Sequence, residues 1–594
     1  MPSKNFNILG NIKIDDPKDG KEKLAYHTFS EAKGGVLIII DPESLTGECY
    51  ETPGDSGAWA LCQYDDKLLM GSCPHKALIY SFDLKSRTFD GEPAKAPGVT
   101  YIWTLGRASD GFVYGGTYAE CRLMRYDPKT FSITDLGRVD PDENNYYSRS
   151  VHCEAPGRLF IDCGYSVKRI FVYDLEKGGF SQFYKDGAQV SHITADYVCV
   201  SNDSGDCELL DPYTGKPLYE RAFKIEEIPI LAESEPIFKS LQAEADKNTD
   251  VRLGQLANRR VIKLKNGDMF GLEGQEIFKL AKNEHTPSFH AFPVEPPATC
   301  AFGIAVDESG KVWGTSSFGM TAFCYDAKTG ESVNTLGLTM CGGECYGVVP
   351  YKGKIYFTAY AGGEHIVYDP SQPWRMRENV NPKMVFTVSP GYIRPHTRSI
   401  HDGNGVIWTG WLAGYGTYGS AITIWDANTG EIKFFRDIIG ENAIEALTLY
   451  KDTAIFDTYK GGNGLPTVKD APKYLCKITS AGEIVQKKEY AESLGSLCIN
   501  GGGGLISIGG ALHLLDPETL LTKPVGISMR DAQIRCIGEN VIAVGSECGY
   551  IIDQRTGAVL QKTGGVGADV LDVCVSGLEV WAAAYDGWIY KMDV

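Results

Sequence analysis

Apolar and polar residues alternate along most of the chain in short runs, which is the period of a β-strand. One pattern recurs: an alternating apolar strand, then Asp, then a turn that often ends in Thr-Gly. Apart from the interval between Asp211 and Phe278, consecutive copies lie roughly 37 to 60 residues apart, the spacing of four-stranded β-propeller blades. The copies contain Asp41, Asp83, Asp127, Asp174, Asp211, Asp326, Asp369, Asp426, Asp516 and Asp553, with degenerate copies at Phe278 and Lys477 and a last copy at Asp593.

The chemistry that these copies share is that of a turn. Asp accepts hydrogen bonds from backbone N–H groups two residues further on, Pro presets φ, and Gly takes a positive φ at little cost. We therefore interpret the repeated Asp residues as turn formers and assign none of them to function.

The repeat predicts an all-β protein of tandem β-propellers with about 12–13 four-stranded blades in total. Because a single ring holds about four to eight blades, two domains are expected, at 55–290 and 297–594. A short helical insert is predicted near 224–258, either at the domain junction or within one degenerate blade. The last repeat ends after its third strand, so we expect N-terminal strands from 1–50, such as Phe6 to Ile14, to close the second propeller.

The net charge and the cysteine usage of the chain limit the binding partners and the cellular location that can be expected. The net charge is −18 without a cluster of Lys and Arg, which argues against nucleic acid and anionic membranes as partners. No apolar run approaches the about 18 residues of a membrane span, and the start lacks the apolar stretch of a secretory signal. The 17 cysteines are scattered and include a lone pair, Cys341 and Cys345, that we interpret as thiols and not as a metal site. A cytoplasmic location is predicted.

Two predicted innermost strands share the pattern Arg-Ser-apolar-His, at 149–152 and 398–401. Loops entering such strands line the funnel of a propeller, the default place for a ligand. Strand alternation puts Arg149 and His152 on opposite faces, so both cannot point into the channel from regular positions. One interpretation is structural, with each His in a buried hydrogen bond between blades and each Arg on the rim.

The other interpretation is a site for β-elimination from a uronic acid. A neutral His or a Tyr removes the proton next to the carboxylate, Arg holds the carboxylate, and Tyr or His protonates the leaving oxygen. The predicted catalytic residues are His401, His152, Tyr147 and His396, and the predicted substrate-binding residues are Arg149, Arg398, Arg394, Tyr392, Trp103 and Tyr346. We assign no metal ligand and no cofactor, and we expect a small-molecule or oligosaccharide ligand that is acidic.

Four stretches resemble a set of bacterial double β-propeller repeat proteins, and the resemblance runs from about residue 55 to the end. They are GTYAECRLMRYDPKTFSITDLGRVDPDENNYYSRSVH, YDPSQPWRMRENVNPKMVF, WLAGYGTYGSAITIWDANTG and DTYKGGNGLPTVKDAPKYLCKI. The resemblance implies the fold and implies little about activity, because many chemistries share propellers. More distantly, the His, Tyr and Arg set is similar to that of propeller-type polysaccharide lyases.

The function predicted is thus that of a carbohydrate-active enzyme, a lyase acting on an acidic, uronate-containing oligosaccharide. Two alternatives stay open. A non-catalytic scaffold for protein–protein interaction would have apolar patches on a propeller face. A metal-dependent hydrolase or lyase would need three His or carboxylate ligands converging on one point.

Overall fold

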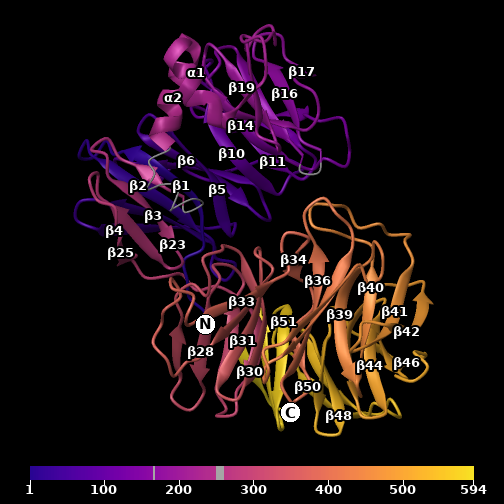
Figure 1. Cartoon of the computed structure of the whole chain (residues 1–594). Coiled ribbons are helices and arrows are strands. Elements are labelled where there is room, and N and C mark those ends of the chain that lie inside the picture. Colours follow the sequence, from indigo (N-terminus) through magenta and orange to yellow (C-terminus); the bar gives the residue numbers. More distant parts are fainter. Residues whose placement is uncertain (165–166, 249–259) are drawn as a thin grey trace. The chain divides into compact units, whose positions relative to one another are not determined.

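A computed structural model describes residues 1–164, 167–248 and 260–594 of the chain. The chain divides into two units (Figure 1). We call Ile8–Phe29 with Gly34–Glu295 the N-terminal unit, and Met1–Asn7, Ser30–Lys33 and Pro296–Val594 the C-terminal unit. The division at 295/296 falls between the two predicted domains.

The described residues form thirteen antiparallel sheets, and most of them have four strands. In the N-terminal unit the first strands are β1 (Ile8–Asp15), β5 (Gly57–Tyr64), β10 (Tyr101–Arg107), β14 (Ser148–His152), β18 (Ala188–Ile193) and β22 (Ile262–Lys263). In the C-terminal unit they are β26 (Ala301–Val306), β30 (Glu344–Tyr351), β34 (Tyr392–Pro395) with β35 (Ile400–His401), β39 (Ala443–Tyr450), β43 (Leu494–Asn500), β47 (Gln533–Ile537) and β51 (Val570–Ser576).

Each sheet is built from strands that follow one another in the chain, from the first strand outward. First strands of successive sheets contact each other: β5 lies against β1 and β10, and β43 lies against β39 and β47. In the C-terminal unit, β51 of the last sheet contacts β26 of the first. Small sheets of this kind, packed through their first strands, give each unit β-propeller character, as the repeat predicts.

The repeated Asp residues form the predicted turns. Asp41 ends β3 (Gly35–Asp41), and its Oδ1 accepts hydrogen bonds from the N–H groups of Glu43 at 2.8 Å and Ser44 at 3.0 Å. Asp553 does the same for Arg555 and Thr556, at 2.8 and 2.9 Å. These hydrogen bonds stabilise the charged carboxylate and lower the pKa of Asp553. Their role is local and structural.

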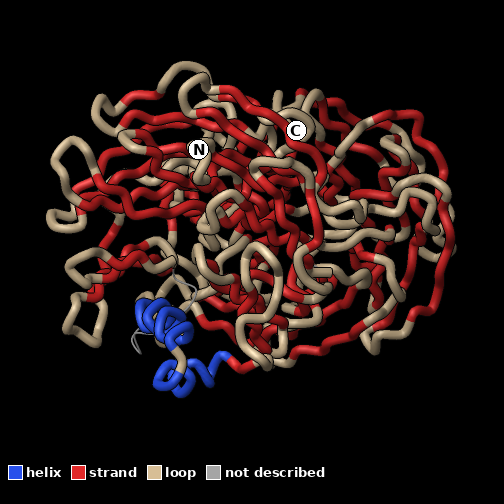
Figure 2. Tube along the Cα trace, turned by 90° about the horizontal axis from the view of Figure 1, so that it is seen from above, coloured by secondary structure: helices blue, strands red, loops and turns tan. Residues whose placement is uncertain are grey.

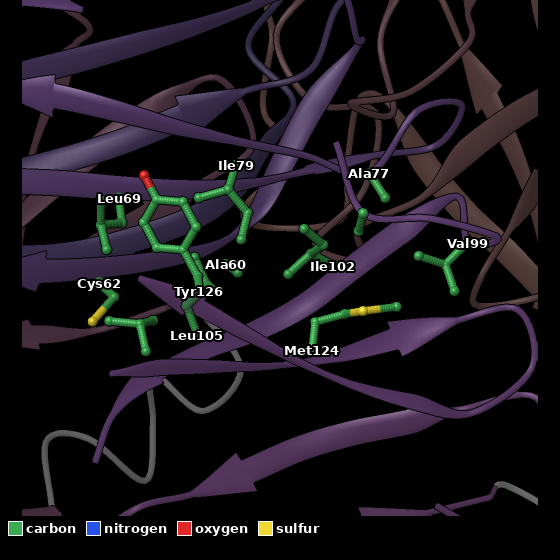
Figure 3. Close-up of a cluster of buried hydrophobic side chains, with 12 residues drawn as sticks. Ala60, Cys62, Leu69, Ala77, Ile79, Val99, Ile102, Leu105, Met124 and Tyr126 are labelled. Atoms are coloured by element: carbon green, nitrogen blue, oxygen red, sulfur yellow. The ribbon is translucent and has the colours of Figure 1, made fainter. Parts of the chain in front are cut away.

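The hydrophobic core is divided into clusters that lie between neighbouring sheets. The cluster in Figure 3 joins Leu69 and Ile79 of one sheet to Ile102, Met124 and other residues of the next. Its members are almost completely buried, so each pair of sheets is held together mainly by removal of apolar surface from water. Such packing fixes the positions of the first strands.

The predicted helical insert is present, but at neither of the two predicted places. Helices α1 (Ile228–Ser234) and α2 (Pro236–Asn248) come in the chain between the sheet that ends with β21 (Phe223–Lys224) and the sheet that begins with β22, inside the N-terminal unit. They are the blue elements in Figure 2. Their apolar residues, including Phe238, pack on Tyr197 and Phe223 of the preceding sheet. This packing holds the insert against the side of that sheet. Residues 249–258 of the prediction lie outside the described residues.

The N-terminal strands also differ from the expected arrangement. β1 pairs with β2 (Glu22–Thr28) as the first strand of its own sheet, and the last sheet of the chain has only the strands β51, β52 (Glu579–Ala584) and β53 (Ile589–Met592). Residues before β1 do join the C-terminal unit, where Asn5 donates hydrogen bonds to Phe318 and Thr321. The strand β1 has its own hairpin partner, which satisfies its backbone locally.

Candidate functional site

The first strands of most sheets carry a β-bulge near their beginning. In β10 the pairing with the next strand skips Trp103, in β14 it skips Arg149, and in β30 it skips Tyr346. β26 and β39 are irregular at the corresponding place, next to Phe302 and Glu445. A bulge adds one residue to a strand and re-aims its side chain, so one special position recurs around each unit.

This bulge overturns the expectation from strand alternation for the Arg149 strand. Ser148 pairs with Cys163 and Ser150 with Asp162, so Arg149 is an extra residue outside the regular alternation. The second Arg-Ser-apolar-His copy is more irregular still. The N–H groups of both His396 and Thr397 point to the carbonyl oxygen of Gly410, at 2.9 and 3.3 Å, and regular pairing resumes only at Ile400. Arg398 lies in the extra segment.

In the C-terminal unit, Tyr346 and Arg394, two of the predicted residues, meet around a buried acid. Arg394 Nη1 donates to the Tyr346 hydroxyl at 2.7 Å and lies 3.5 Å from Glu344 Oε2, while the Tyr346 hydroxyl donates to Glu344. The guanidinium also lies 4.0 Å from the ring centroid of Tyr360. Burial raises the pKa of Glu344, and Arg394 and Tyr346 oppose that rise.

His396 is held in one tautomer. Its Nδ1 lies 2.9 Å from the carbonyl oxygen of Ile444 on β39, so Nδ1 carries the proton. Its Nε2 is then an acceptor, and the hydroxyl of Tyr459 lies 3.4 Å away. Burial lowers the pKa of His396, and the charges of Arg394 and Arg398 lower it further, whereas the hydrogen bond to Ile444 raises it. A half-buried, neutral imidazole with an available Nε2 is suited to accept a proton.

Arg398 occupies the same group of side chains. Its Nη2 donates to the Leu571 carbonyl at 3.0 Å, and its Nε lies 3.9 Å from Asp572. Its guanidinium carbon is 5.8 Å from the Phe302 ring, which in turn lies 5.0 Å from the Tyr346 ring. The structure therefore brings together Tyr346, Arg394, His396 and Arg398 of the predicted set.

A carboxyl group that the sequence did not point to lies beside them. Glu31 belongs to the short segment Ser30–Lys33 of the C-terminal unit. Burial and the nearby charge of Glu344 raise the pKa of Glu31 to about 7, although hydrogen bonds from Ser317 and Cys300 oppose the rise. Its Oε2 is buried and has no hydrogen-bond partner among the described residues. Glu31 can therefore give or take a proton near neutral pH.

Three further tyrosines around this site were also missed, although the sequence contains a signal for them. Tyr360 and Tyr459 each end the second strand of a sheet, in FTAY and FDTY, and Tyr585 directly follows another such strand, in AAAY. Tyr360 contacts Arg394, Tyr459 contacts His396, and Tyr585 interacts electrostatically with Glu31 and Arg398. A search for one repeated residue at the end of the second strand would have found them.

The other predicted residues fall into a separate group in the N-terminal unit. The rings of Trp103 and Tyr147 lie 5.9 Å apart, and the guanidinium of Arg149 lies 4.3 Å from the Trp103 centroid. Trp59, on the neighbouring first strand, is 5.4 Å from Trp103. All four side chains are half-buried. The predicted set is thus divided between the two units.

Three predicted residues lie apart from both groups. His152 Nε2 lies 3.0 Å from Asp162, on the neighbouring strand of its own sheet, and not against another blade. His401 is exposed, and its Nδ1 accepts the N–H of Gly403 at 3.2 Å within a turn. Tyr392 is buried and donates to Asp437 at 2.6 Å. These contacts give all three residues local structural partners.

Neither a metal site nor a membrane helix is found among the described residues. Over 1–164, 167–248 and 260–594, no three His, Cys, Asp or Glu side chains are grouped as metal ligands would be. In the same ranges, no helix has the length and apolar character needed to span a membrane.

No family profile and no curated protein matches the chain. Several solved structures are similar to parts of the chain or to nearly all of it. Streptogramin B lyase is 16% identical, with a TM-score of 0.38, over 50% of this chain and 94% of that one. BamB from Moraxella catarrhalis is 12% identical, with a TM-score of 0.35, over 57% and 94%. The extracellular domain of the putative one component system BT4673 from B. thetaiotaomicron is 13% identical, with a TM-score of 0.27, over 99% and 75%. Likenesses at this level carry no argument about activity.

Proposed function

We propose that the chain is a tandem β-propeller protein, with six blades in the N-terminal unit and seven in the C-terminal unit. The thirteen sheets support this proposal, as do the contacts between successive first strands and the contact of β51 with β26. The total agrees with the twelve or thirteen repeats counted in the sequence. In this arrangement, the bulged first strands point their extra side chains toward the axis of each ring.

We propose further that the C-terminal unit is a lyase that cleaves uronate-containing oligosaccharides by β-elimination. The supporting observation is His396, neutral, fixed by Ile444, and flanked by two guanidinium groups and a tyrosine. Such a set suits removal of a weakly acidic proton next to a carboxylate, because the base is uncharged and the charge that develops is met by Arg.

In the proposed reaction, His396 Nε2 takes the proton at C5 of the uronate. The electron pair forms the C4–C5 double bond, and the C4–O bond breaks with the leaving oxygen taking its electrons. Arg398 and Arg394 stabilise the carboxylate as it gains enolate character. Glu31 in its neutral form, or Tyr459, supplies the proton to the leaving oxygen. The step consumes no oxidant or reductant, and its products are an unsaturated and a shortened saccharide.

The test is to incubate the protein with oligosaccharides of galacturonate, glucuronate, guluronate and mannuronate and to follow the ultraviolet absorbance of the unsaturated product. We expect at least one substrate to give a signal, His396→Ala to reduce the rate by about 100-fold or more, and Tyr459→Phe to reduce it less. His401→Ala is the matched control, because this exposed His lies outside the cluster. Absence of product with every substrate, or full activity of His396→Ala, would overturn the proposal.

The direction of the pKa shift of His396 determines how the proposed lyase activity should depend on pH. Because its pKa is lowered, the imidazole stays neutral into mildly acidic solution, and the rate should fall on the acid side only below the ordinary His range. Substrates would be imported oligosaccharides if the protein is cytoplasmic. We propose that location because all 17 cysteines are free thiols.

A further inference from the structure

The aromatic group of the N-terminal unit has features that its own packing does not require. We define the Trp–Arg cluster as Trp59, Tyr101, Trp103, Arg149 and Arg260. A guanidinium lies over each indole: Arg149 over Trp103 at 4.3 Å, and Arg260 over Trp59 at 5.2 Å. The Tyr101 ring stacks on Trp103 at 5.1 Å. A guanidinium that lies over an indole is attracted to the ring face and can still use its N–H groups for other acceptors.

Two polar groups in the cluster lack compensation from the described part of the protein. Trp103 Nε1 is buried and has no hydrogen-bond partner among the described residues. Burial alone lowers the pKa of Arg260 to about 10, and no acidic side chain in the described ranges counters it. The Arg260 guanidinium does donate to the Leu9 carbonyl, and this neutral acceptor leaves its charge unbalanced. An anion in the cluster would supply the missing charge and an acceptor for the indole N–H.

We propose that the Trp–Arg cluster is a second, non-catalytic binding site for a carboxylated saccharide. The Arg pair would hold the carboxylate, Trp103 Nε1 would donate to an oxygen, and the half-buried indole edges would contact the apolar face of the sugar ring. The choice of a uronate as the ligand rests on the proposed function, whereas the contacts that define the Trp–Arg cluster are independent of it. This unit has no described counterpart of the His396–Tyr459 pair in the cluster, so it would bind without cleaving.

The test is isothermal titration of the full chain with trigalacturonate and with the other uronate trisaccharides. The protein carries His396→Ala, so that the ligand is not consumed. Because His396→Ala keeps Arg394 and Arg398, the C-terminal unit can also bind these ligands, so we expect two binding events. The event that belongs to the Trp–Arg cluster should weaken at least 10-fold with Arg149→Gln and with Trp103→Ala. Trp588→Ala is the matched control, since this exposed Trp of the C-terminal unit should leave binding unchanged. Thermal melts check that the variants fold. If Trp103→Ala does not fold, Arg149→Gln alone decides the test.

Two outcomes separate this proposal from the lyase. If uronates are cleaved but Arg149→Gln and Trp103→Ala leave titration unchanged, the second site is wrong and the lyase stands. If no substrate is cleaved but a uronate binds in a manner that depends on Arg149, the lyase is wrong and the binding site stands. Failure of every uronate to bind overturns the second site.

A different observation points to a redox-active thiol pair in the C-terminal unit. Cys498 on β43 and Cys536 on β47 belong to neighbouring sheets, and their Sγ atoms lie 2.9 Å apart. Cys498 is buried and Cys536 is exposed. A hydrogen bond from the Cys498 thiol lowers the pKa of Cys536, burial opposes that shift, and Arg535 lowers it further. Cys536, the exposed residue of the two, therefore carries the better nucleophile.

We infer that Cys498 and Cys536 form a reversible disulfide on exposure to a peroxide. The Cys536 thiolate attacks one peroxide oxygen, giving a sulfenic acid, and the other oxygen leaves as water after protonation. The Cys498 sulfur then attacks the sulfenic sulfur and expels a second water. Two thiols and one hydrogen peroxide thus become one disulfide and two waters. The sulfur atoms need to approach by only about 1 Å to reach bonding distance.

The test is to treat reduced protein with hydrogen peroxide, block the remaining thiols, digest with trypsin and sequence the cross-linked peptides by mass spectrometry. Cys548 lies in the same tryptic peptide as Cys536, so Cys548→Ser is the matched control and should leave the cross-link in place. Cys536→Ser should abolish it, and dithiothreitol should reverse it. The buried pair Cys199 and Cys207 should stay reduced longer. Oxidation of Cys536 to a sulfenic or higher acid without a bond to Cys498 would overturn the inference.

Discussion

At the scale of single residues, burial decides the proton affinity of Glu31. The pKa of this carboxyl group is raised from an ordinary 4.5 to about 7 by burial and by Glu344. A carboxyl group whose pKa is raised by folding binds its proton more tightly in the folded chain than in the unfolded one. Its contribution to stability is therefore present below about pH 4.5 and is lost as the pH rises toward 7.

The wild-type protein should lose stability between pH 5 and 8 as Glu31 ionises. We therefore predict that Glu31→Gln loses less stability over this range. Relative to the wild type, the variant should gain about 1–2 kcal/mol across this range, since a tenfold change in proton affinity is worth about 1.4 kcal/mol and partial exposure reduces the effect. Urea unfolding at the two pH values measures it. Glu441→Gln is a control, because this carboxylate pairs with Lys460 at the surface. Parallel pH profiles for wild type and Glu31→Gln would contradict the prediction.

At the scale of elements, the strand order of a blade was predictable, and the bulge in its first strand was not. The sequence YIWTLGR predicted β10 residue for residue, because period-two alternation and flanking turns are local signals. The skipped pairing at Trp103 depends on the neighbouring strand, and a single strand carries no trace of it. For the same reason, strand alternation did not predict that Arg149 is an extra residue outside the regular pairing of β14. The role of Glu31 could not be predicted from the sequence, because its raised pKa depends on burial and on Glu344, which is far away along the chain.

The bulge in β30 makes a further prediction at this scale. Gly347 follows the bulge residue Tyr346, and a Cβ there would overlap the hydroxyl groups of Ser399 and Thr358, which hydrogen-bond each other at 2.8 Å. Gly347→Ala should cost about 1–3 kcal/mol and should reduce lyase activity, because Ser399 carries the neighbouring Arg398. Denaturant unfolding and the product assay measure the two effects.

A matched glycine separates steric overlap from a general effect of replacing Gly. Gly564 ends β50 (Val559–Gly564), and a Cβ there meets nothing within 4 Å. Gly564→Ala should therefore be neutral or slightly stabilising. Equal destabilisation by both substitutions would show that overlap with Ser399 is not the cause.

At the scale of the whole molecule, Asp572 connects the last sheet of the C-terminal unit to others around it. This buried carboxylate accepts the N–H of Ile304 on the first strand of the unit at 3.0 Å. It also pairs with Arg535 on β47 and lies 3.9 Å from Arg398 Nε. One side chain thus contacts the strands on both sides of β51 and a residue of the candidate site. In the proposed ring of seven sheets, joining the first and last sheets would cover two apolar sheet faces that otherwise stay exposed to water.

We predict that Asp572→Ala weakens the C-terminal unit selectively. Removing Asp572 leaves the Ile304 N–H and the half-buried arginine charges without their partner, which costs about 1–3 kcal/mol. Because the chain has two units with separate cores, calorimetry should show two transitions, and only one of them should move to lower temperature. Asp569→Ala, three residues earlier and exposed, should move neither. A shift of both transitions by the same amount would mean that the units unfold as one. No shift in either would mean that Asp572 does not hold the last sheet of the C-terminal unit to its neighbours.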